Sequence, residues 1–391
     1  MLRSEATIDL AAIRANAEAV RSLTGTDVMA VVKADGYGHG MIPAARAALA
    51  GGASWLGVAL LEEALALREA GFTEPLLAWL WTPQDFALLT RALAVGVDVS
   101  VSSIAALQLV CAASAEQDEP ARVHLKADTG LSRNGATEAD WPDLLDAAGK
   151  AVESGQLEVI GIWSHLVRSE EPDHPTTTEQ VSRFEAALAR AVQAGIEPPV
   201  RHLANSAGAL TVPAARFDLV RIGIALYGLS PVVGQDFGLR PAMTLRSHLA
   251  NVKRLPAGQG IGYGHVYRTA EATTAALVPL GYGDGIPRSA TNLGPVAIGG
   301  RRFRVSGRVA MDQFVVDVGD ATVVEGDEVI LFGPGTAGEP TAQEWADALD
   351  TIHYEVVTRI GARVPRRHTD TDTDTDTDTN GQTSADPGQG A

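Results

Sequence analysis

The segment Val28-Met-Ala-Val-Val-Lys33-Ala-Asp-Gly-Tyr37-Gly-His-Gly40 joins an apolar run to a glycine-rich turn. The run predicts a strand that is covered on both faces, as the strands of a parallel sheet are. Lys33 follows the run directly and Tyr37 lies in the turn, so both are expected at the carboxyl end of the strand. Lys33 can be a solvated strand end, or an amine that forms a Schiff base with a carbonyl cofactor. This segment alone favours the solvated lysine.

Apolar runs of the same kind recur up to residue 222, and amphipathic helical patterns separate most of them. Eight short strands that alternate with helices favour a (β/α)8 barrel over an open doubly wound sheet. The expected strands span residues 28–33, 55–60, 75–80, 97–101, 122–128, 158–165, 200–205 and 218–222. A helix capped by Asp9 is expected to extend to about residue 23, and others span residues 61–70, 85–95, 139–153 and 179–194.

The composition changes after about residue 238, where Val, Thr, Gly and Pro become more frequent and short strand patterns follow one another. Expected strands span residues 243–253, 273–278, 296–298, 303–309, 314–318 and 328–332, and helical patterns return at 342–349 and 353–360. We therefore predict a barrel domain over residues 1–238 and a mainly β domain over 239–368. The Thr-Asp repeat and the polar sequence after it predict a disordered tail over residues 369–391.

The composition is that of a globular chain, with 46% hydrophobic and 20% charged residues among 391. The net charge is −17, and six aspartates lie in the tail, which leaves −11 for the body. Such acidity argues against nucleic-acid and anionic membrane partners. The single cysteine, Cys111, excludes a disulfide within the chain and a cysteine-based metal site. No apolar run suits a signal peptide or a transmembrane helix, so we expect a cytoplasmic protein.

Polar residues follow several of the expected barrel strands, where functional side chains of such barrels gather. Each has an ordinary alternative explanation, such as a satisfied polar group or a helix cap. Together they place cationic groups and backbone donors around one mouth, which favours a phosphorylated or carboxylated ligand. The histidines have no metal-ligand spacing, and no dinucleotide, Walker A or serine-hydrolase motif occurs. The residues are Lys33, Tyr37, Lys126, Arg133, His165, Asn205, Ser206, Arg221, Gly223 and Ile224.

This set of motifs resembles the alanine racemases, barrel-type (fold-type III) enzymes that use pyridoxal 5′-phosphate (PLP). The family signature around the PLP lysine is matched by Ala30-Val-Val-Lys33-Ala-Asp-Gly-Tyr37-Gly-His-Gly40. Further matches follow in the family's order over about residues 4–367. They are Lys126-Ala-Asp-Thr-Gly-Leu-Ser-Arg133, Ser164-His165, Asn205-Ser206, Arg221-Ile-Gly-Ile-Ala-Leu-Tyr-Gly228, Gly262-Tyr263-Gly264, Pro279-Leu-Gly-Tyr282-Gly-Asp-Gly285, Met311-Asp312-Gln313 and Arg363-Val-Pro-Arg366.

The resemblance implies an isomerase that interconverts L-alanine and D-alanine and supplies D-alanine for peptidoglycan. Lys33 would hold PLP as a Schiff base and serve as one of two catalytic bases. The other base would be Tyr263 of the partner subunit, because the family forms a head-to-tail homodimer with its site at the interface. The first ten or so residues would join the second domain.

The remaining family roles carry over residue by residue. His165 and Arg221 would form the network behind the cofactor and Tyr263. The phosphate would be bound by Tyr37, Ser206 and the amides of Gly223 and Ile224, next to Asn205. The substrate carboxylate would meet Arg133 and the Met311 amide. Lys126 matches a lysine that some relatives carry in carbamylated form, and Tyr282 and Asp312 match residues that line the route of the substrate.

The chemistry explains why these residue types are needed. Racemisation removes the Cα proton on one face and returns one on the other, so it needs two bases on opposite sides of a planar intermediate. Lysine and tyrosine both have pKa values near 10 and need cationic neighbours or desolvation to act near neutral pH. Arg221 has no acceptor and keeps its proton, so the PLP ring nitrogen would stay neutral. That limits delocalisation and favours proton return over transamination.

Two departures from the family pattern and three other functions have to be considered. Many relatives carry a tyrosine that reaches the phosphate where this chain has Ala362, so one phosphate contact is expected to be missing or replaced by water. Tyr354 belongs to an earlier position of the same helix and is not expected to take this role. Ala310 stands where some relatives have cysteine.

A decarboxylase of this class would carry an acid in place of Arg221, and a racemase of broad specificity stays open. A non-catalytic PLP carrier would resemble the barrel alone, which the presence of Tyr263 argues against.

Overall fold

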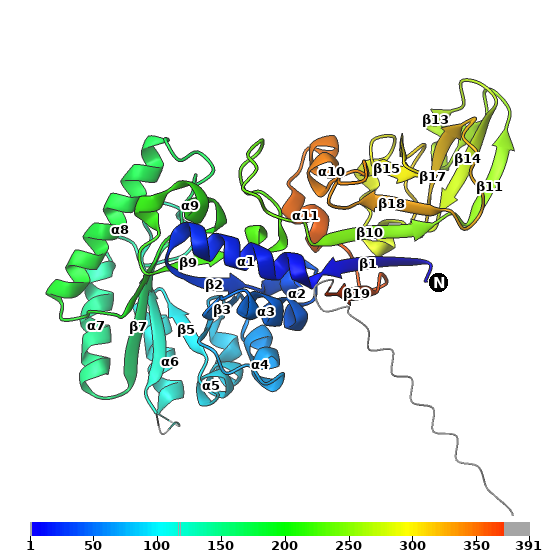
Figure 1. The fold of residues 1–391 in the computed structure, drawn as a ribbon. Coiled ribbons are helices and arrows are strands. Elements are labelled where there is room, and N and C mark those ends of the chain that lie inside the picture. Colours follow the sequence, from blue (N-terminus) through cyan, green and yellow to red (C-terminus); the bar gives the residue numbers. More distant parts are fainter. Residues whose placement is uncertain (1, 116, 118, 371–391) are drawn as a thin grey trace, which may run out of the picture.

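The computed structural model describes residues 2–115, 117 and 119–370, which form a barrel and a second, mainly β part (Figure 1). The barrel contains eight parallel strands in the order β8-β7-β6-β5-β4-β3-β2-β9. Arg221 N in β9 donates to the carbonyl of Ala204, two residues after the end of β8, at 3.0 Å, so the barrel is nearly closed. The expected barrel is therefore confirmed. The strands are β2 (Asp27–Val31), β3 (Trp55–Val58), β4 (Leu76–Ala78), β5 (Asp98–Val101), β6 (Ala121–Lys126), β7 (Leu157–Trp163), β8 (Val200–His202) and β9 (Leu219–Ile222).

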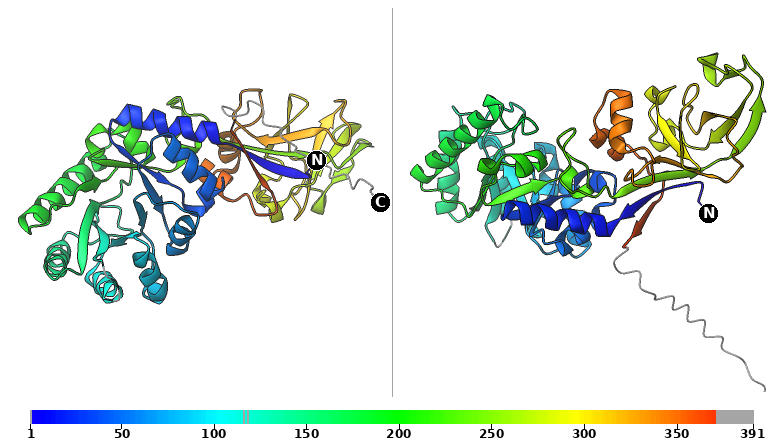
Figure 2. Two further views of the ribbon diagram at one scale, coloured as in Figure 1. Left: turned by 60° about the horizontal axis from the view of Figure 1, so that its bottom comes forward. Right: turned by 45° about the horizontal axis from the view of Figure 1, so that its top comes forward.

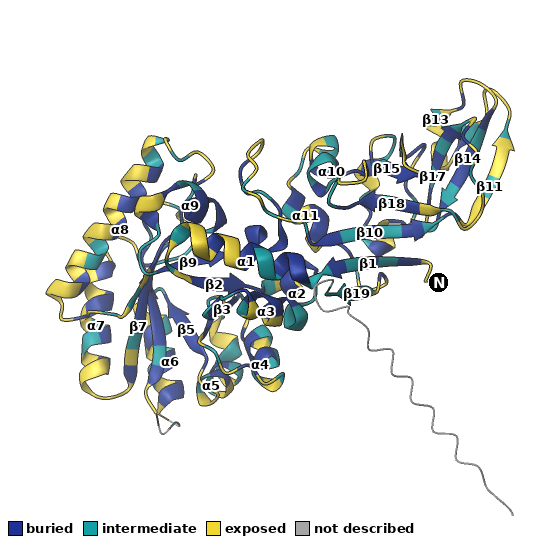
Figure 3. Ribbon diagram, in the orientation of Figure 1, coloured by how far each residue is buried: buried dark blue, intermediate teal, exposed yellow. Residues whose placement is uncertain are grey.

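Helices surround the barrel, and their outer faces are exposed while the strands are buried on both faces (Figures 2 and 3). The first helix begins where the Asp9 carboxylate accepts from Ala12 N at 3.0 Å, and it ends at Gly25 with φ 64°. Its apolar stripe, with Ile13 and Val20, is buried. The helices are α1 (Leu10–Thr24), α2 (Lys33–Tyr37), α3 (Met41–Ala50), α4 (Leu61–Glu69), α5 (Phe86–Ala94), α6 (Ile104–Ser114), α7 (Trp141–Glu153), α8 (Pro175–Gln193) and α9 (Ser206–Thr211).

The second part is built on a six-stranded sheet with the order β16-β15-β18-β10-β1-β19. Its strand β1 (Ser4–Asp9) comes from the N-terminus, pairs antiparallel with β10 and parallel with β19, and alternates between buried and half-buried residues. The other strands of this sheet are β10 (Met243–His248), β15 (Pro295–Ile298), β16 (Arg301–Arg304), β18 (Glu328–Phe332) and β19 (Arg366–Thr369). Two helices complete this region, α10 (Ala342–Leu349) and α11 (His353–Thr358).

Two smaller sheets extend the second part away from the barrel (Figure 1). One has the order β11-β14-β17 and the other pairs β12 with β13. Their strands are β11 (Asn251–Leu255), β14 (Thr273–Val278), β17 (Phe314–Gly319), β12 (Gly260–Ile261) and β13 (Tyr267–Arg268). Within the described ranges, no helix is both long and apolar enough to cross a membrane.

The structure corrects three of the expected elements. The expected strand 243–253 is two strands, because the chain leaves the β1 sheet after β10 and pairs with β14 as β11. The expected strand 303–309 ends early, and Gly307 has φ 90°, which a continuing strand cannot adopt. Thr369, which we assigned to the tail, is the last residue of β19. Residues 371–391 lie outside the described part of the chain.

The glycine-rich turn after β2 is also where the two parts of the molecule meet. A Cβ at Gly38 would lie 2.6 Å from Val357 O in α11, so only glycine allows this approach. Arg366 Nε donates to Gly38 O at 3.0 Å, and His368 Nε2 lies 2.8 Å from His39 O. The second domain is thus fastened to the loop that carries the barrel's first candidate residues.

Candidate active site

Lys33 begins α2, a single turn in which the backbone is left-handed. Ala34, Asp35 and Tyr37 have φ values of 53°, 52° and 53°, and Gly36 has 61°. Three non-glycine residues in this region cost free energy, and such strain is found where function fixes the backbone. The turn is closed by Gly36 N donating to Val32 O at 2.8 Å. It directs Lys33 and Tyr37 to one mouth, where Lys33 Nζ lies 5.9 Å from the centroid of the Tyr37 ring.

Glu63 holds this turn in place from the neighbouring helix. Its Oε1 accepts from Ala34 N at 2.6 Å, and its Oε2 accepts from Ala59 N and Leu60 N at 2.9 and 3.0 Å. Burial and the positive charge of Arg133 lower the pKa of Lys33, and Glu63 opposes them. We missed Glu63 in the sequence, although its place in the first turn of α4 is typical of a capping carboxylate.

Arg221 lies inside the mouth and is only 5% exposed. Its Nη1 donates to His202 O at 3.0 Å, and its Nη2 donates to the carbonyls of Ser164 and Leu203 at 2.8 and 3.0 Å. No carboxylate contacts it and no group accepts from its Nε among the residues that the structure describes. Burial lowers the pKa of Arg221 to about 9, so it stays protonated at neutral pH with one N–H group left to bind a ligand.

His165 and Trp163 pack against this guanidinium. His165 Nδ1 lies 3.3 Å from Arg221 Nη2, and because arginine only donates, Nδ1 must be the acceptor and Nε2 must carry the proton. Burial, Arg221 and Arg133 lower the pKa of His165 well below its ordinary value, so the ring is neutral. The Trp163 ring centroid lies 4.9 Å from Arg221 Cζ.

Lys126, at the end of β6, lies on the same indole with Nζ 4.1 Å from the ring centroid. The side chain is buried at 4% exposure. Burial, followed by Arg221 and Arg133, lowers the pKa of Lys126 to about 7. A substantial fraction of this amine is therefore unprotonated near neutral pH, unlike an ordinary surface lysine.

Backbone donors converge where β8 and β9 end. The Asn205 side chain accepts from Gly208 N at 2.9 Å and begins α9. Ser206 Oγ accepts from Gly223 N at 3.0 Å and from Ala225 N at 3.4 Å. A Cβ at Gly223 would lie 2.2 Å from Tyr37 Oη, so the phenol reaches bare backbone here. With Ile224, at the start of the short helix 224–227, these groups form a cradle of small donors.

Tyr354 brings a second phenol to this cradle, which corrects our sequence interpretation. It lies on α11, and its ring centroid is 6.4 Å from that of Tyr37. Burial raises its pKa to about 12, so it is a neutral donor. Ala362, where we expected the family tyrosine, is exposed. Tyr354 belongs to an earlier position of the helix than Ala362, and the close packing of α11 on Gly38 brings it to the mouth.

Arg133 ends the loop that follows β6. The Asp128 carboxylate accepts from Gly130 N at 2.9 Å and Ser132 N at 3.1 Å, which folds the loop back over the barrel. Arg133 is exposed, and it has no hydrogen bond or ion pair with any described residue. Its charge acts on Lys33, Lys126 and His165, so it faces the same mouth as an unpaired cation.

The candidate residues of the second domain are exposed. Tyr263, Met311 and Tyr282 have exposed fractions of 71%, 54% and 45%, and Asp312 is also exposed. Tyr263 lies between β12 and β13, far from the barrel mouth of the same chain (Figures 1 and 2). One chain therefore does not bring Tyr263 to Lys33.

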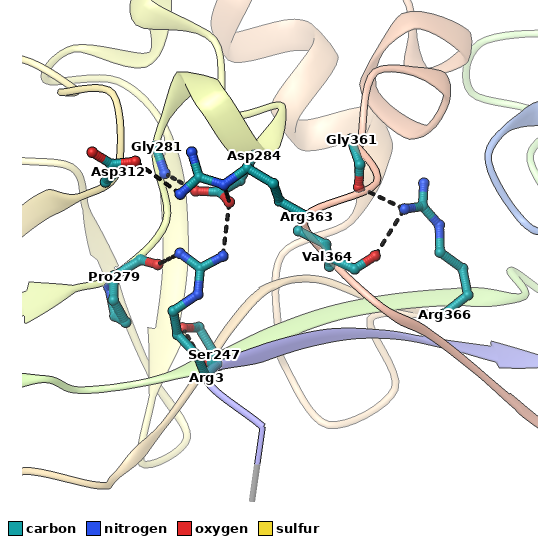
Figure 4. Close-up of polar contacts among 10 residues, drawn as sticks. All are labelled: Arg3, Ser247, Pro279, Gly281, Asp284, Asp312, Gly361, Arg363, Val364 and Arg366. Atoms are coloured by element: carbon teal, nitrogen blue, oxygen red, sulfur yellow. Dashed lines mark hydrogen bonds and ion pairs between the residues drawn. The ribbon is translucent and has the colours of Figure 1, made fainter.

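Ion pairs to a buried carboxylate fix the loops that carry Tyr282 and Met311 (Figure 4). The Asp284 carboxylate is fully buried and pairs with Arg3 at 2.8 Å and Arg363 at 3.2 Å. Arg363 also binds Asp312 at 2.8 Å, and Gly283 N donates to Met311 O at 2.8 Å. These loops form a rigid surface although their side chains point to solvent.

The chain is similar in sequence to known proteins. The alanine racemase N-terminal domain matches residues 8–231 and the alanine racemase C-terminal domain matches residues 242–368. The chain is 59% identical to the alanine racemase of Frankia casuarinae over 94% of this chain and 96% of that protein.

Solved structures agree with the sequence comparison. The alanine racemase of Streptomyces lavendulae superimposes with a TM-score of 0.92 at 50% identity, covering 94% of this chain and 97% of that one. The alanine racemase of Bacillus anthracis, solved with bound L-Ala-P, gives 0.85 at 33% identity, covering 94% and 95%. The chain therefore belongs to the alanine racemase family.

Proposed function

We propose that the chain is a PLP-dependent racemase that interconverts L-alanine and D-alanine. The observation that carries this proposal is the arrangement of Lys33 and Arg221 at one barrel mouth, with the small-donor cradle around Tyr37 beside them. Its relatives at 50–59% identity are named alanine racemases. The Lys33 amine, the buried Arg221 guanidinium and the cradle match the three polar groups of PLP, which are its aldehyde, its ring nitrogen and its phosphate.

The chain's donors fit PLP group by group. Lys33 offers an amine for the aldehyde, and the Nε–H of Arg221, without an acceptor among the described residues, suits the ring nitrogen. Tyr37, Tyr354, Ser206 and the amides of Gly223 and Ile224 would hold the phosphate. PLP supplies an electron sink that acidifies the Cα–H bond of an amino acid. Because Arg221 can only donate, it would limit the depth of that sink.

Proton transfer is assigned to Lys33 and to Tyr263 of the partner subunit. A lowered pKa brings the Lys33 amine closer to the basic form that it needs to take a proton. The exposure of Tyr263 supports a site completed by a second copy of the chain in a homodimer. The Nε2–H of His165 would then donate to the Tyr263 oxygen and hold it in position.

The amino-acid substrate would be held by its carboxylate. Arg133, which has no ion-pair partner among the described residues, would meet the carboxylate at the mouth, and the Met311 amide of the partner subunit would add a neutral donor. Tyr282 and Asp312 of that subunit would line the route of the substrate. The unprotonated form of Lys126 is the one that carbon dioxide can convert to a carbamate, as its counterpart in some relatives is. Supply of D-alanine for peptidoglycan in the cytoplasm stays a prediction.

The test is a racemisation assay on protein purified with PLP, with its visible spectrum recorded first. We expect pyridoxal absorbance that borohydride converts to a stable adduct on Lys33, and conversion of L-alanine to an equal mixture of both enantiomers. A panel of amino acids defines the breadth of specificity. Bound PLP with unchanged L-alanine would favour the carrier function, and release of carbon dioxide would favour a decarboxylase.

A further inference from the structure

A row of buried polar side chains leads from Arg221 through the barrel interior to the opposite mouth. Arg221 Nη1 lies 3.2 Å from His202 Nδ1, and His202 Nε2 lies 2.8 Å from His124 Nδ1. His124 Nε2 lies 3.3 Å from Asp98 Oδ2. Both histidines are fully buried and Asp98 is 1% exposed. Asp98 begins β5, at the amino end of the barrel strands, where Arg122 Nε donates to its Oδ1 at 2.7 Å.

The direction of every hydrogen bond in this row follows from its two ends. Arginine can only donate and an ionised carboxylate can only accept. His202 must therefore accept at Nδ1 and donate from Nε2, and His124 must do the same toward Asp98. Burial and Arg221 lower the pKa of His202 well below its ordinary value, which agrees with a neutral ring. Hydrogen bonds aligned in one direction polarise and strengthen one another.

The backbone makes room for this row. A Cβ at Gly161 in β7 would lie 2.3 Å from His124 Nδ1, so another residue would displace His124 from His202. The register of β6 with β7 shifts between Val123 and His124, which sets Gly161 opposite His124. Trp163 stacks on the His202 ring at 5.5 Å with an interplanar angle of 3°. Burying three titratable groups costs free energy compared with an apolar core. The presence of Asp98, His124 and His202 in the barrel interior therefore indicates a function.

We propose that Asp98, His124 and His202 are positioning residues that act on the site through Arg221. Arg221 has no carboxylate partner among the described residues, and the row connects it to Asp98, whose negative charge lies at the far end. The row fixes which Arg221 N–H bonds are engaged and leaves Nε–H directed at the ligand. This role rests on the proposed function, because Arg221 would bind PLP.

The kinetic test compares Asp98→Leu with a matched control, Asp218→Leu. Asp218 forms a separate ion pair at the same end of the barrel, 2.6 Å from Arg201 Nε, and in the described part of the chain no hydrogen bond joins its side chain to His124 or His202. Both variants are purified with PLP and checked for folding and cofactor content by thermal melting and visible absorbance. We expect kcat for L-alanine to fall about tenfold in Asp98→Leu with little change in KM, as removal of partners behind site residues does in metal enzymes. The control should stay within about twofold of wild type.

If Asp98 were purely structural, Asp98→Leu would lower the melting temperature and leave kcat within about twofold of wild type, as in the control, which would overturn the proposal. If Asp98→Leu does not fold, nitrogen-15 NMR of histidine-labelled wild type decides. The row predicts neutral Nε2–H tautomers for His124 and His202, with signals assigned through His124→Gln and His202→Asn. A Nδ1–H tautomer or a charged ring at either position would contradict the row. These tautomers are measured whether or not the wild type racemises alanine, so the two proposals can fail separately.

Discussion

The barrel mouth and the loops of the second domain supply the two halves of the candidate site in opposite ways. At the mouth, Arg221 and Lys126 are 5% and 4% exposed and held by carbonyls, histidines and an indole. In the second domain, Tyr263 is 71% exposed and points to solvent. The first half is organised within one chain. Under the proposed function, the second half would act only where a partner subunit covers it.

This difference has an energetic basis. A guanidinium can stay buried only if most of its N–H groups find acceptors, and the barrel strand ends provide carbonyls at fixed positions. The second-domain loops are rigid because Asp284 ties together Arg3 and Arg363, yet the side chains that they carry bury little surface. Exposed aromatic and apolar side chains on a rigid surface are typical of a protein interface.

The largest effect is expected at the mouth, from Lys33→Ala. Loss of this amine removes both the covalent link to PLP and one base, so racemisation should fall by at least about a thousandfold. Racemisation is measured by chiral chromatography, and the borohydride adduct should disappear. Lys253→Ala, an exposed lysine on β11, is the control and should behave as wild type. Substantial racemisation by Lys33→Ala would show that the mouth is not where the chemistry occurs.

Tyr263→Phe tests the half of the candidate site that lies on the exposed loops of the second domain. Removal of the phenol should lower kcat by about a hundredfold or more with PLP still bound, because one general base is lost. Tyr267→Phe is the matched control on the adjacent strand, where the phenol instead binds Asp317 at 2.8 Å. Equal activity of both variants would remove Tyr263 from the mechanism.

Tyr354→Phe tests the corrected phosphate cradle. Loss of one hydrogen bond to a charged phosphate should weaken PLP binding by about tenfold, measured by equilibrium dialysis of the apoenzyme. Ala362→Tyr supplies a phenol at the exposed position that we first considered, and it should leave PLP affinity unchanged. Stronger PLP binding by Ala362→Tyr would place the phosphate contact at position 362 instead.

Lys126→Met gives the smallest effect, a pH-dependent change in stability. The unfolded chain binds more protons than the folded one between about pH 7 and 10.5, because folding lowers the pKa of Lys126. Wild-type stability therefore rises with pH across this window. The variant should melt about 2–4 °C above wild type below pH 7, and the difference should shrink as pH rises. A variant that melts below wild type at pH 6 would indicate a paired or carbamylated Lys126.

The sequence predicted the barrel well because its strands are continuous apolar runs that end at polar residues. The expected strand over residues 218–222 and β9 (Leu219–Ile222) differ by one residue, and Arg221, with apolar neighbours on both sides in the sequence, is buried. Contacts across the fold were not visible in the same way. Glu63 reaches Ala34 only because that turn is left-handed, and His124 meets His202 only because Gly161 and a register shift bring them together. Spacing in the sequence records none of these packing relations.

The most direct test of a site divided between two subunits is complementation between Lys33→Ala and Tyr263→Phe. Each variant alone should be nearly inactive. If each site combines Lys33 of one subunit with Tyr263 of the other, a mixed dimer contains one intact site. Equal amounts, dissociated and reassembled at random, should then recover about a quarter of wild-type activity. A mixture as inactive as its parents, with mixed dimers demonstrated by affinity tags, would place both residues in one subunit and contradict the account.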